Sequence, residues 1–318
     1  MTALPAIEIE NLGHTYGERV ALRDVSFSVS RGELFGLLGP NGGGKTTLFK
    51  ILATLLRPTS GCARVFGDDV SASPMAVRRR LGVVFQSSSL DPKLTVAENL
   101  RHQGHLYGLR GTRLRERIEE VLKRLGLADR RDERAEKLSG GLRRRIEIAK
   151  GLLHQPEVLL LDEPSSGLDA GARRDLRLYL RQLCDQDSVT VFLTTHFMDE
   201  AESCDRLAIL DRGRLVAEGK PDALKSRIGG DVIVLETHEP ENLRAQIQQR
   251  FGNHVSVVDG RVRLERPHGH RFVTELVEAF PGQIDGLSVA KPTLEDVFIR
   301  ETGHQFWEET PRGKRPHA

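Results

Sequence analysis

The stretch Gly39-Pro40-Asn41-Gly42-Gly43-Gly44-Lys45-Thr46 decides the fold of this 318-residue chain. It fits the spacing G-x-x-x-x-G-K-[ST], in which glycines let consecutive backbone N–H groups curl around a chain of phosphates. An apolar run from Leu34 to Leu38 precedes it, and a helical pattern from Lys45 to Leu56 follows it. The N-terminus of that helix favours the same negative charge. The sequence therefore predicts an α/β domain that binds a nucleoside triphosphate.

Two side chains in this loop have the chemistry that a bound triphosphate needs. Lys45 can bridge the β- and γ-phosphates, and the hydroxyl of Thr46 can ligate Mg²⁺. Thr47 completes the set that we assign to nucleotide binding. The alternative is a Gly-rich turn with a chance lysine, but the letters of the motif and both flanking elements agree with the nucleotide site. The loop alone does not specify the nucleotide.

A second acidic motif follows a fully apolar strand, Val158 to Leu161. Asp162 and Glu163 then lie at the carboxyl end of a buried strand, where parallel sheets hold ligands. Asp162 can hold Mg²⁺ through water. Glu163 can orient or deprotonate an attacking water, a general-base role worth about 10²–10⁴ in rate. The alternative is a solvated acidic turn, which the nearby phosphate loop disfavours.

The run Leu138-Ser139-Gly140-Gly141 is a second turn of small residues that opens a helix. It is therefore a second anion-binding N-terminus. The chain has a single lysine-bearing phosphate loop, however, and one nucleotide does not need two such cradles on the same domain.

With these motifs the chain resembles the nucleotide-binding subunit of ATP-binding cassette (ABC) transporters, over roughly residues 6–222. The resemblance implies that the nucleotide is ATP with Mg²⁺. It implies that the Ser139 turn closes over ATP held by a second copy, so that a head-to-tail homodimer encloses two nucleotides. It also implies a separate integral membrane permease, and hence a cytoplasmic protein that is peripheral on the inner face of the cell membrane.

Other family positions occur in the family's order. Tyr16 resembles the aromatic residue that stacks on adenine, and Gln86 resembles the glutamine that touches Mg²⁺ and relays to the membrane partner. Residues 166–169 resemble the loop that crosses the dimer interface, and His196 resembles the switch histidine on the γ-phosphate. Alone, Tyr16 or His196 is more often a packed core residue; six motifs in order outweigh that. The resemblance thus implies catalytic roles for Lys45, Glu163 and His196, and metal contacts from Thr46, Gln86 and Asp162.

The rest of the chain adds two regions to this cassette. Residues 90–137 read as a helical insertion, with a capping box at Thr95 and Glu98 and a helix over 113–125. After Gly229-Gly230 the order β-α-β-β-α-β is that of a ferredoxin-like unit, and a last helix follows Thr293. The predicted fold class is α/β, a P-loop NTPase ABC cassette with a mixed β core, an antiparallel β subdomain and a helical subdomain. A small α+β ferredoxin-like domain follows at the C-terminus.

The C-terminal segment carries a narrower resemblance. Residues 223–303, and the ending at residues 292–298 (PTLEDVF) in particular, resemble the accessory segment of daunorubicin-resistance-type exporter ATPases. We predict an ATPase domain over 6–222, an accessory domain over 230–303, and a basic, disordered tail over 304–318. The accessory domain is either a stabilising or dimerising cap or a regulatory element.

Composition limits the partners. The formal net charge is +2 at pH 7, too balanced for nucleic-acid binding, and we expect none. The basic runs at 78–80 and 143–145 are predicted to be solvated helix faces paired with acids. Three widely spaced cysteines suit a reduced cytosol. No apolar stretch approaches a membrane span, and no signal peptide is expected.

The predicted function is therefore an ATP-driven motor for an exporter of drugs or other amphiphiles. One alternative is an importer motor of the same family, against which the C-terminal ending argues. Another is a non-transport ABC ATPase acting on DNA or ribosomes, which resembles tandem cassettes or carries long inserts. A third is a regulator that binds ATP without hydrolysing it, against which Glu163 and His196 argue. The cargo does not follow from the sequence.

Overall fold

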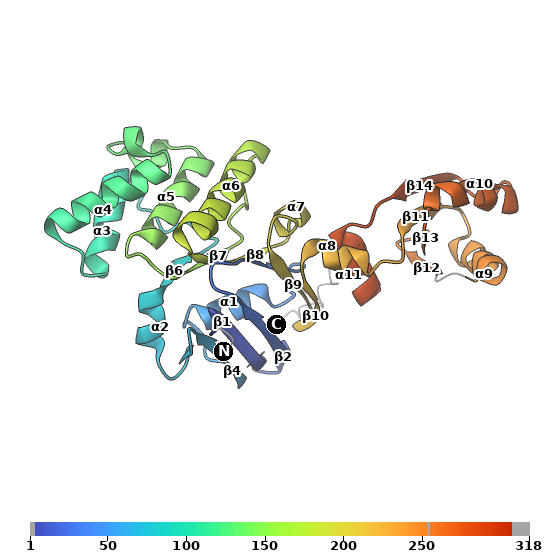
Figure 1. Ribbon diagram of the computed structural model, residues 1–318, viewed down its shortest axis with the longest axis horizontal. Helices are drawn as coiled ribbons and strands as arrows, with labels where there is room; N and C mark the ends of the chain where they lie inside the picture. The colour runs from blue at the N-terminus through green and yellow to red at the C-terminus, as the bar shows by residue number, and fades with distance from the viewer. Residues whose placement is uncertain (1–3, 253–254, 307–318) are drawn as a thin grey trace, which may run out of the picture. The chain divides into compact units, whose positions relative to one another are not determined.

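The computed structural model describes residues 4–252 and 255–306, and it divides the chain into two compact units between Glu218 and Gly219. The first unit contains two sheets and a group of helices, and the second contains one sheet with its own helices (Figure 1). This division lies a few residues before residue 222, where the sequence predicts that the ATPase domain ends.

A six-stranded sheet forms the centre of the first unit, in the order β10-β9-β3-β8-β7-β6. The pairs β9-β3, β3-β8, β8-β7 and β7-β6 are parallel, so their carboxyl ends share one edge. Every residue of β3 and β7 is buried, as their unbroken apolar runs predict. The strands are β3 (Leu34–Leu38), β6 (Leu81–Val84), β7 (Val158–Asp162), β8 (Thr190–Thr195), β9 (Arg206–Asp211) and β10 (Arg214–Gly219).

A second, antiparallel sheet has the order β2-β1-β4-β5. Val25, Phe27 and Val29 are buried and alternate with exposed residues, the period of a half-buried strand. Its first two strands have 10 and 11 residues. The strands are β1 (Ile7–Tyr16), β2 (Arg19–Val29), β4 (Ser60–Val65) and β5 (Asp68–Asp69).

Two hydrophobic clusters cover the two faces of the central sheet. On β7, Val158 and Leu160 belong to one cluster, while Leu159 and Leu161 belong to the other. The first cluster includes the buried face of α1 (Lys45–Leu52), and the second includes α5 (Gly140–Leu152) and α6 (Ala170–Asp187), so these helices lie on opposite faces (Figure 1). The predicted extension of α1 to Leu56 is wrong, because Thr54 takes a left-handed conformation with φ +60°.

The helices within residues 90–137 confirm the predicted helical insertion. The capping box is present: Glu98 N–H donates to Thr95 Oγ1 at 3.2 Å, and Thr95 N–H donates to Glu98 Oε2 at 2.8 Å. The predicted apolar face of the next helix is buried at Leu114, Ile118 and Val121. The remaining helices of this unit are α2 (Pro74–Arg80), α3 (Val96–Leu106), α4 (Gly111–Arg124), the short 3₁₀ helices η1 (Ala128–Arg130) and η2 (Ala135–Lys137), and α7 (Met198–Ala201).

The second unit has the predicted β-α-β-β-α-β order. Its antiparallel sheet runs β12-β13-β11-β14, the strand order of a ferredoxin-like unit, and helices α9 and α10 connect its strands. The elements are α8 (Pro221–Ser226), β11 (Asp231–Glu236), α9 (Pro240–Phe251), β12 (Val255–Val258), β13 (Arg261–Arg266), α10 (Gly269–Ala279), β14 (Gly286–Ala290) and α11 (Leu294–Thr302).

The packed chain extends past the predicted domain end at residue 303. Phe306 is 1% exposed, and its ring meets that of Phe298 with centroids 4.9 Å apart. The start of the predicted disordered tail is therefore part of the folded unit. The rest of that tail, residues 307–318, lies outside the described residues.

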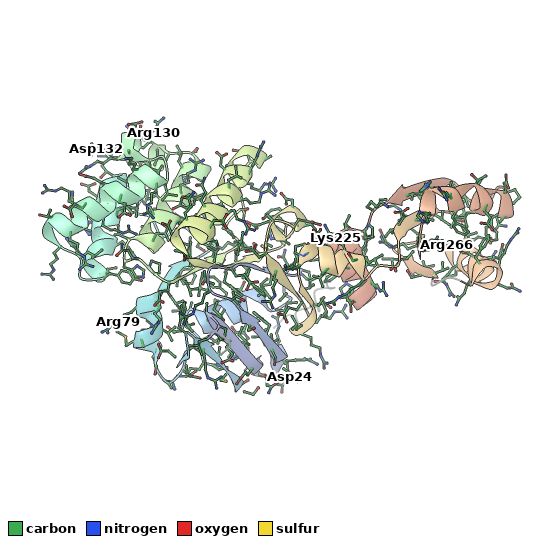
Figure 2. All side chains as sticks on the ribbon, in the orientation of Figure 1. Asp24, Arg79, Arg130, Asp132, Lys225 and Arg266 are labelled. Atoms are coloured by element: carbon green, nitrogen blue, oxygen red, sulfur yellow. The ribbon has the colours of Figure 1, made fainter. Side chains whose placement is uncertain are left out.

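Charged side chains mostly face outward, as Figure 2 shows for Arg79, Arg130 and Asp132. One expectation fails: Arg144, in the second basic run, is only 8% exposed. It lies on the same side of α5 as the buried Ile148 and Gly151, four and seven residues on. Within the described residues, no helix combines the length and apolarity that crossing a membrane requires.

Candidate active site

The phosphate loop joins β3 to α1, and the packing around it requires glycine at positions 39 and 44. A Cβ at Gly39 would lie 2.3 Å from the carbonyl oxygen of Leu210. At Gly44, φ is +109° and a Cβ would lie 2.8 Å from the carbonyl oxygen of Ala21. Gly44 is also the N-cap of α1, and because it has no side chain it leaves the first-turn N–H groups to an anion.

Lys45 is held inside this loop, with 4% of its surface exposed. Its ammonium donates to the carbonyl oxygens of Gly39 at 2.7 Å and Pro40 at 3.1 Å. Burial lowers the pKa of Lys45, and the carboxylate of Glu163 opposes that shift. Thr46, next along α1, is exposed at the loop, whereas Thr47 is buried.

The acidic pair lies at the carboxyl end of β7. The hydroxyl of Thr194, on the neighbouring strand β8, donates to Asp162 Oδ1 at 2.6 Å. Burial raises the pKa of Asp162, and this hydrogen bond partly offsets the shift. Glu163 has φ +44°, a left-handed conformation that is uncommon for a residue with a Cβ. Its N–H donates to Thr194 Oγ1 at 3.0 Å, so β8 supports both acidic residues.

The carboxylate of Glu163 is the point at which the predicted residues converge. Gln86 Nε2 donates to its Oε2 at 3.0 Å, and Ser166 Oγ donates to the same oxygen at 3.1 Å. Its Oε1 lies 3.6 Å from the ammonium of Lys45 and 3.3 Å from Nδ1 of His196. Four segments far apart in the sequence thus meet at one carboxylate that is 10% exposed.

Tyr16 lies near the phosphate loop through the strand pair β1-β2. In that pair His14 is opposite Leu22, and Leu22 borders Gly44. Two residues beyond His14, the ring of Tyr16 is 45% exposed and meets the His14 ring edge-on at 4.5 Å. An exposed aromatic face at this position can stack on a planar base.

The Ser139 turn is not part of this convergence. Ser139 is the N-cap of α5 and accepts a hydrogen bond from Leu142 N–H at 3.3 Å. A Cβ at Gly140 would lie 4.0 Å from the carbonyl oxygen of Gly167, so the turn borders the loop over residues 166–169. Gly141 borders the first turn of α6. Helix α5 belongs to the cluster on the face of the sheet opposite α1, so the two anion-binding turns are separate.

Sequence reasoning missed two buried residues that surround the acidic pair, Arg144 and Glu147. They lie three residues apart on α5 and form an ion pair at 3.1 Å. The signal was present, because Arg144 shares a helix face with Ile148 and Gly151, which are apolar. A charged residue on an apolar face indicates a buried partner rather than solvent.

Three comparisons with known proteins identify the family to which the chain belongs. A family model described as ABC transporter matches residues 22–166. The daunorubicin/doxorubicin resistance ATP-binding protein DrrA of Streptomyces peucetius is 39% identical over 94% of this chain and 93% of its own length. The Nod factor export ATP-binding protein I of Bradyrhizobium diazoefficiens is 38% identical over 95% and 97%. The dimeric structure of a bacterial ABC transporter cassette matches with a TM-score of 0.61 at 30% identity, covering 67% of this chain and 98% of that cassette.

Proposed function

This chain belongs to the ABC transporter family, as an ATP-binding and ATP-hydrolysing subunit that powers an exporter, and we propose that two copies do so head to tail beneath a separate permease. The observation that carries the hydrolytic role is the convergence of Lys45, Gln86 and His196 on the carboxylate of Glu163. These residues belong to the phosphate loop, the loop after β6 and the end of β8.

Glu163 is the general base in this proposal. A carboxylate can take a proton from the attacking water when its oxygens are oriented and its surroundings largely exclude solvent. Gln86 and Ser166 orient one oxygen, and His196 lies against the other. Lys45 would offset the negative charge of the phosphates from within the loop, and His196 would contact the γ-phosphate.

The oxygen donors around the loop fit Mg²⁺. Thr46 offers a hydroxyl, Asp162 a carboxylate and Gln86 an amide oxygen, because the amide N–H of Gln86 points to Glu163. The described residues contain no group of three or more His, Cys, Asp or Glu that could hold a metal. Mg²⁺ beside a triphosphate needs no such cage, since phosphate oxygens and water complete its shell. Thr46, Asp162 and Gln86 would hold the ion, which would supply positive charge to offset that of the triphosphate.

The second copy supplies the other anion-binding turn. Ser139, Gly140 and Gly141 open a helix on the sheet face opposite α1, so their N–H groups serve a nucleotide held elsewhere. Head-to-tail pairing would bring this turn over the partner's phosphate loop. Each chain would then bind one nucleotide with its phosphate loop and contact the partner's nucleotide with its Ser139 turn. The dimeric structure of the similar bacterial cassette supports the pairing of two copies.

The protein is then peripheral on the cytoplasmic face of the membrane through its permease. Two relatives are named for daunorubicin and doxorubicin resistance and for Nod factor export. For this chain we propose export of a drug or another amphiphile. We keep residues 6–222 as the ATPase domain, extend the accessory domain from residues 230–303 to Phe306, and expect no nucleic-acid partner.

The test is Glu163→Gln, which keeps the shape of the side chain and removes the base. We expect this variant to bind ATP, to lose turnover by about 100-fold or more, and to accumulate as a dimer with ATP. Size-exclusion chromatography with light scattering measures the dimer. Glu157→Gln, just before the other end of β7 and paired with Arg80 at the surface, is the matched control and should behave as wild type. A strictly monomeric Glu163→Gln with ATP bound would refute the head-to-tail dimer.

A further inference from the structure

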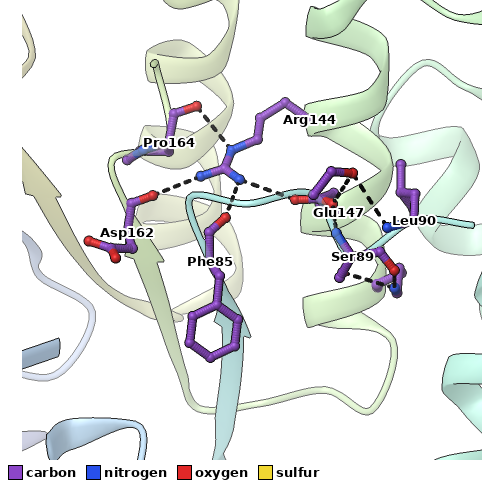
Figure 3. A network of polar contacts seen from close by, with 9 residues as sticks. Phe85, Ser89, Leu90, Arg144, Glu147, Asp162 and Pro164 are labelled. Atoms are coloured by element: carbon purple, nitrogen blue, oxygen red, sulfur yellow. Dashed lines mark hydrogen bonds and ion pairs between the residues drawn. The ribbon is translucent and has the colours of Figure 1, made fainter. Parts of the chain in front are cut away.

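Arg144 joins helix α5 to the backbone of Asp162 and Pro164, the residues before and after Glu163 (Figure 3). Its Nε donates to the carbonyl oxygen of Pro164 at 3.0 Å, and its Nη2 donates to that of Asp162 at 3.0 Å. These two carbonyls flank Glu163. One guanidinium therefore holds the backbone before and after the residue that we assign as general base.

The same guanidinium reaches the loop that carries Gln86. Its Nη1 donates to the carbonyl oxygen of Phe85 at 2.6 Å, and Gln86 in turn donates to Glu163 at 3.0 Å. The planar fork of an arginine presents five N–H donors in fixed directions, which a lysine cannot reproduce. The side chain thus sets the distance between two segments whose side chains meet at the active site.

Glu147 extends this network along the same loop. Its Oε2 accepts from Arg144 at 3.1 Å, and its Oε1 accepts from Ser88 Oγ at 2.8 Å and from Ser89 N–H at 2.6 Å. Because Glu147 is 4% exposed, the pair lies away from solvent. Helix α5 therefore contacts the loop over residues 85–89 on both sides of Gln86.

Stability alone does not account for this arrangement. A buried ion pair is weak evidence for stability, because removing two charges from water costs about as much as their attraction returns. Glu163, in contrast, has a left-handed backbone with φ +44°, and strained residues persist only where their surroundings hold them. Arg144 holds the carbonyls on both sides of that strained residue.

We propose that Arg144, with Glu147 as its buried partner, is a positioning residue that fixes the base Glu163 and the loop of Gln86 relative to helix α5. Helix α5 begins at the Ser139 turn. The contacts of Arg144 therefore connect the turn that would face the partner's nucleotide to the base that would face the nucleotide of the same chain. The inference rests on the base role of Glu163 in the proposed function, and it does not require the dimer.

Arg144→Lys keeps the charge and removes the fork, so it tests positioning directly. A misplaced base lowers turnover without weakening ATP binding, so we expect kcat to fall by about 10- to 100-fold while nucleotide affinity changes less than about twofold. Arg145→Lys, on the next residue and paired with Asp175 at the surface, is the control and should leave both quantities unchanged. An Arg144→Lys variant with the kcat of Arg145→Lys would overturn the inference.

A double-mutant cycle with Glu163→Gln separates positioning from general damage. If Arg144 acts through Glu163, Arg144→Lys adds little to the loss in single-turnover hydrolysis once Glu163 is Gln. Losses that multiply in full would overturn the inference. If Arg144→Lys does not fold, Glu147→Gln is the second test. A loss of kcat smaller than that expected for Arg144→Lys, at unchanged affinity, would support the inference. An unchanged kcat would overturn it. Full turnover in Glu163→Gln alone would instead refute the proposed function.

Discussion

The ammonium of Lys45 lies 3.6 Å from the carboxylate of Glu163, although 118 positions, from 45 to 163, separate them in the sequence. The contact joins the phosphate loop at the end of β3 to the acidic end of β7. Both groups are largely buried, so their attraction is weakly screened by water. In the proposed function, a triphosphate in the loop would compete with Glu163 for this ammonium and so release the carboxylate that we propose as the base.

Lys45→Ala should weaken ATP binding by about 10- to 100-fold, because it removes a charge-assisted phosphate contact worth about 1.5–3 kcal/mol. Titration with a fluorescent nucleotide measures the affinity. Lys50→Ala, on the exposed face of the same helix, is the control and should bind as wild type. Unchanged affinity in Lys45→Ala would show that the loop does not hold the triphosphate.

Ser139→Arg should abolish hydrolysis while the affinity of the monomer for ATP stays within about twofold of wild type, because we propose that the turn acts on the partner's γ-phosphate. Ser139→Ala removes the N-cap hydroxyl of α5, at a cost of about 1 kcal/mol in stability, and thermal unfolding of this variant controls for damage to the helix. The readouts are the fluorescent-nucleotide titration and the ATPase rate. An affinity loss as large as that of Lys45→Ala would mean that Ser139 serves its own subunit's nucleotide.

Glu200→Gln should remove a pH dependence of stability. Burial raises the pKa of Glu200 above its ordinary 4.5, and the hydrogen bond from Ser165 at 2.5 Å only partly offsets it. The folded state therefore favours the protonated acid, and its stabilising contribution is full below pH 4.5 and is lost as the pH rises through the folded-state pKa.

Thermal unfolding from pH 5 to pH 8 measures this effect. The melting temperature of Glu200→Gln minus that of wild type should increase as the pH rises, because glutamine stays neutral. The exposed neighbour Glu202→Gln is the matched control, and its difference from wild type should not follow the same trend. A difference that is constant across this range for Glu200→Gln contradicts the prediction.

Removal of the second unit should leave the ATP site intact. Every residue assigned to ATP chemistry precedes Glu218, and the second unit has its own core around Ile233, Leu243 and Phe272. A chain ending at Gly219 should fold and bind ATP within about threefold of the full chain, with losses confined to dimer stability, coupling or regulation. Affinity, ATPase rate against protein concentration and permease pull-down compare the two chains. A folded truncation that cannot bind ATP would place the second unit in the catalytic fold.

Much of the site could be read from the chain because its determinants are local. The glycines around Lys45 specify a tight loop at a helix N-terminus, and the apolar strand before Asp162 specifies where the acids lie. The capping box at Thr95 and the β-α-β-β-α-β order are equally local patterns, and the structure confirms both. The predicted helix ends were less accurate. Helix α1 ends at Leu52 and Thr54 has a left-handed backbone conformation, which the sequence around it does not indicate.

The sequence by itself determined the family, the phosphate loop and the order of the motifs, because these depend on residue type and spacing within a few residues. Only the tertiary structure decided that Gln86, Ser166 and His196 meet at Glu163, and that Arg144 is buried behind it rather than solvated with its neighbours. The physical reason is that a helix face is buried or exposed according to what packs on it, and the segments that cover α5 come from distant parts of the chain.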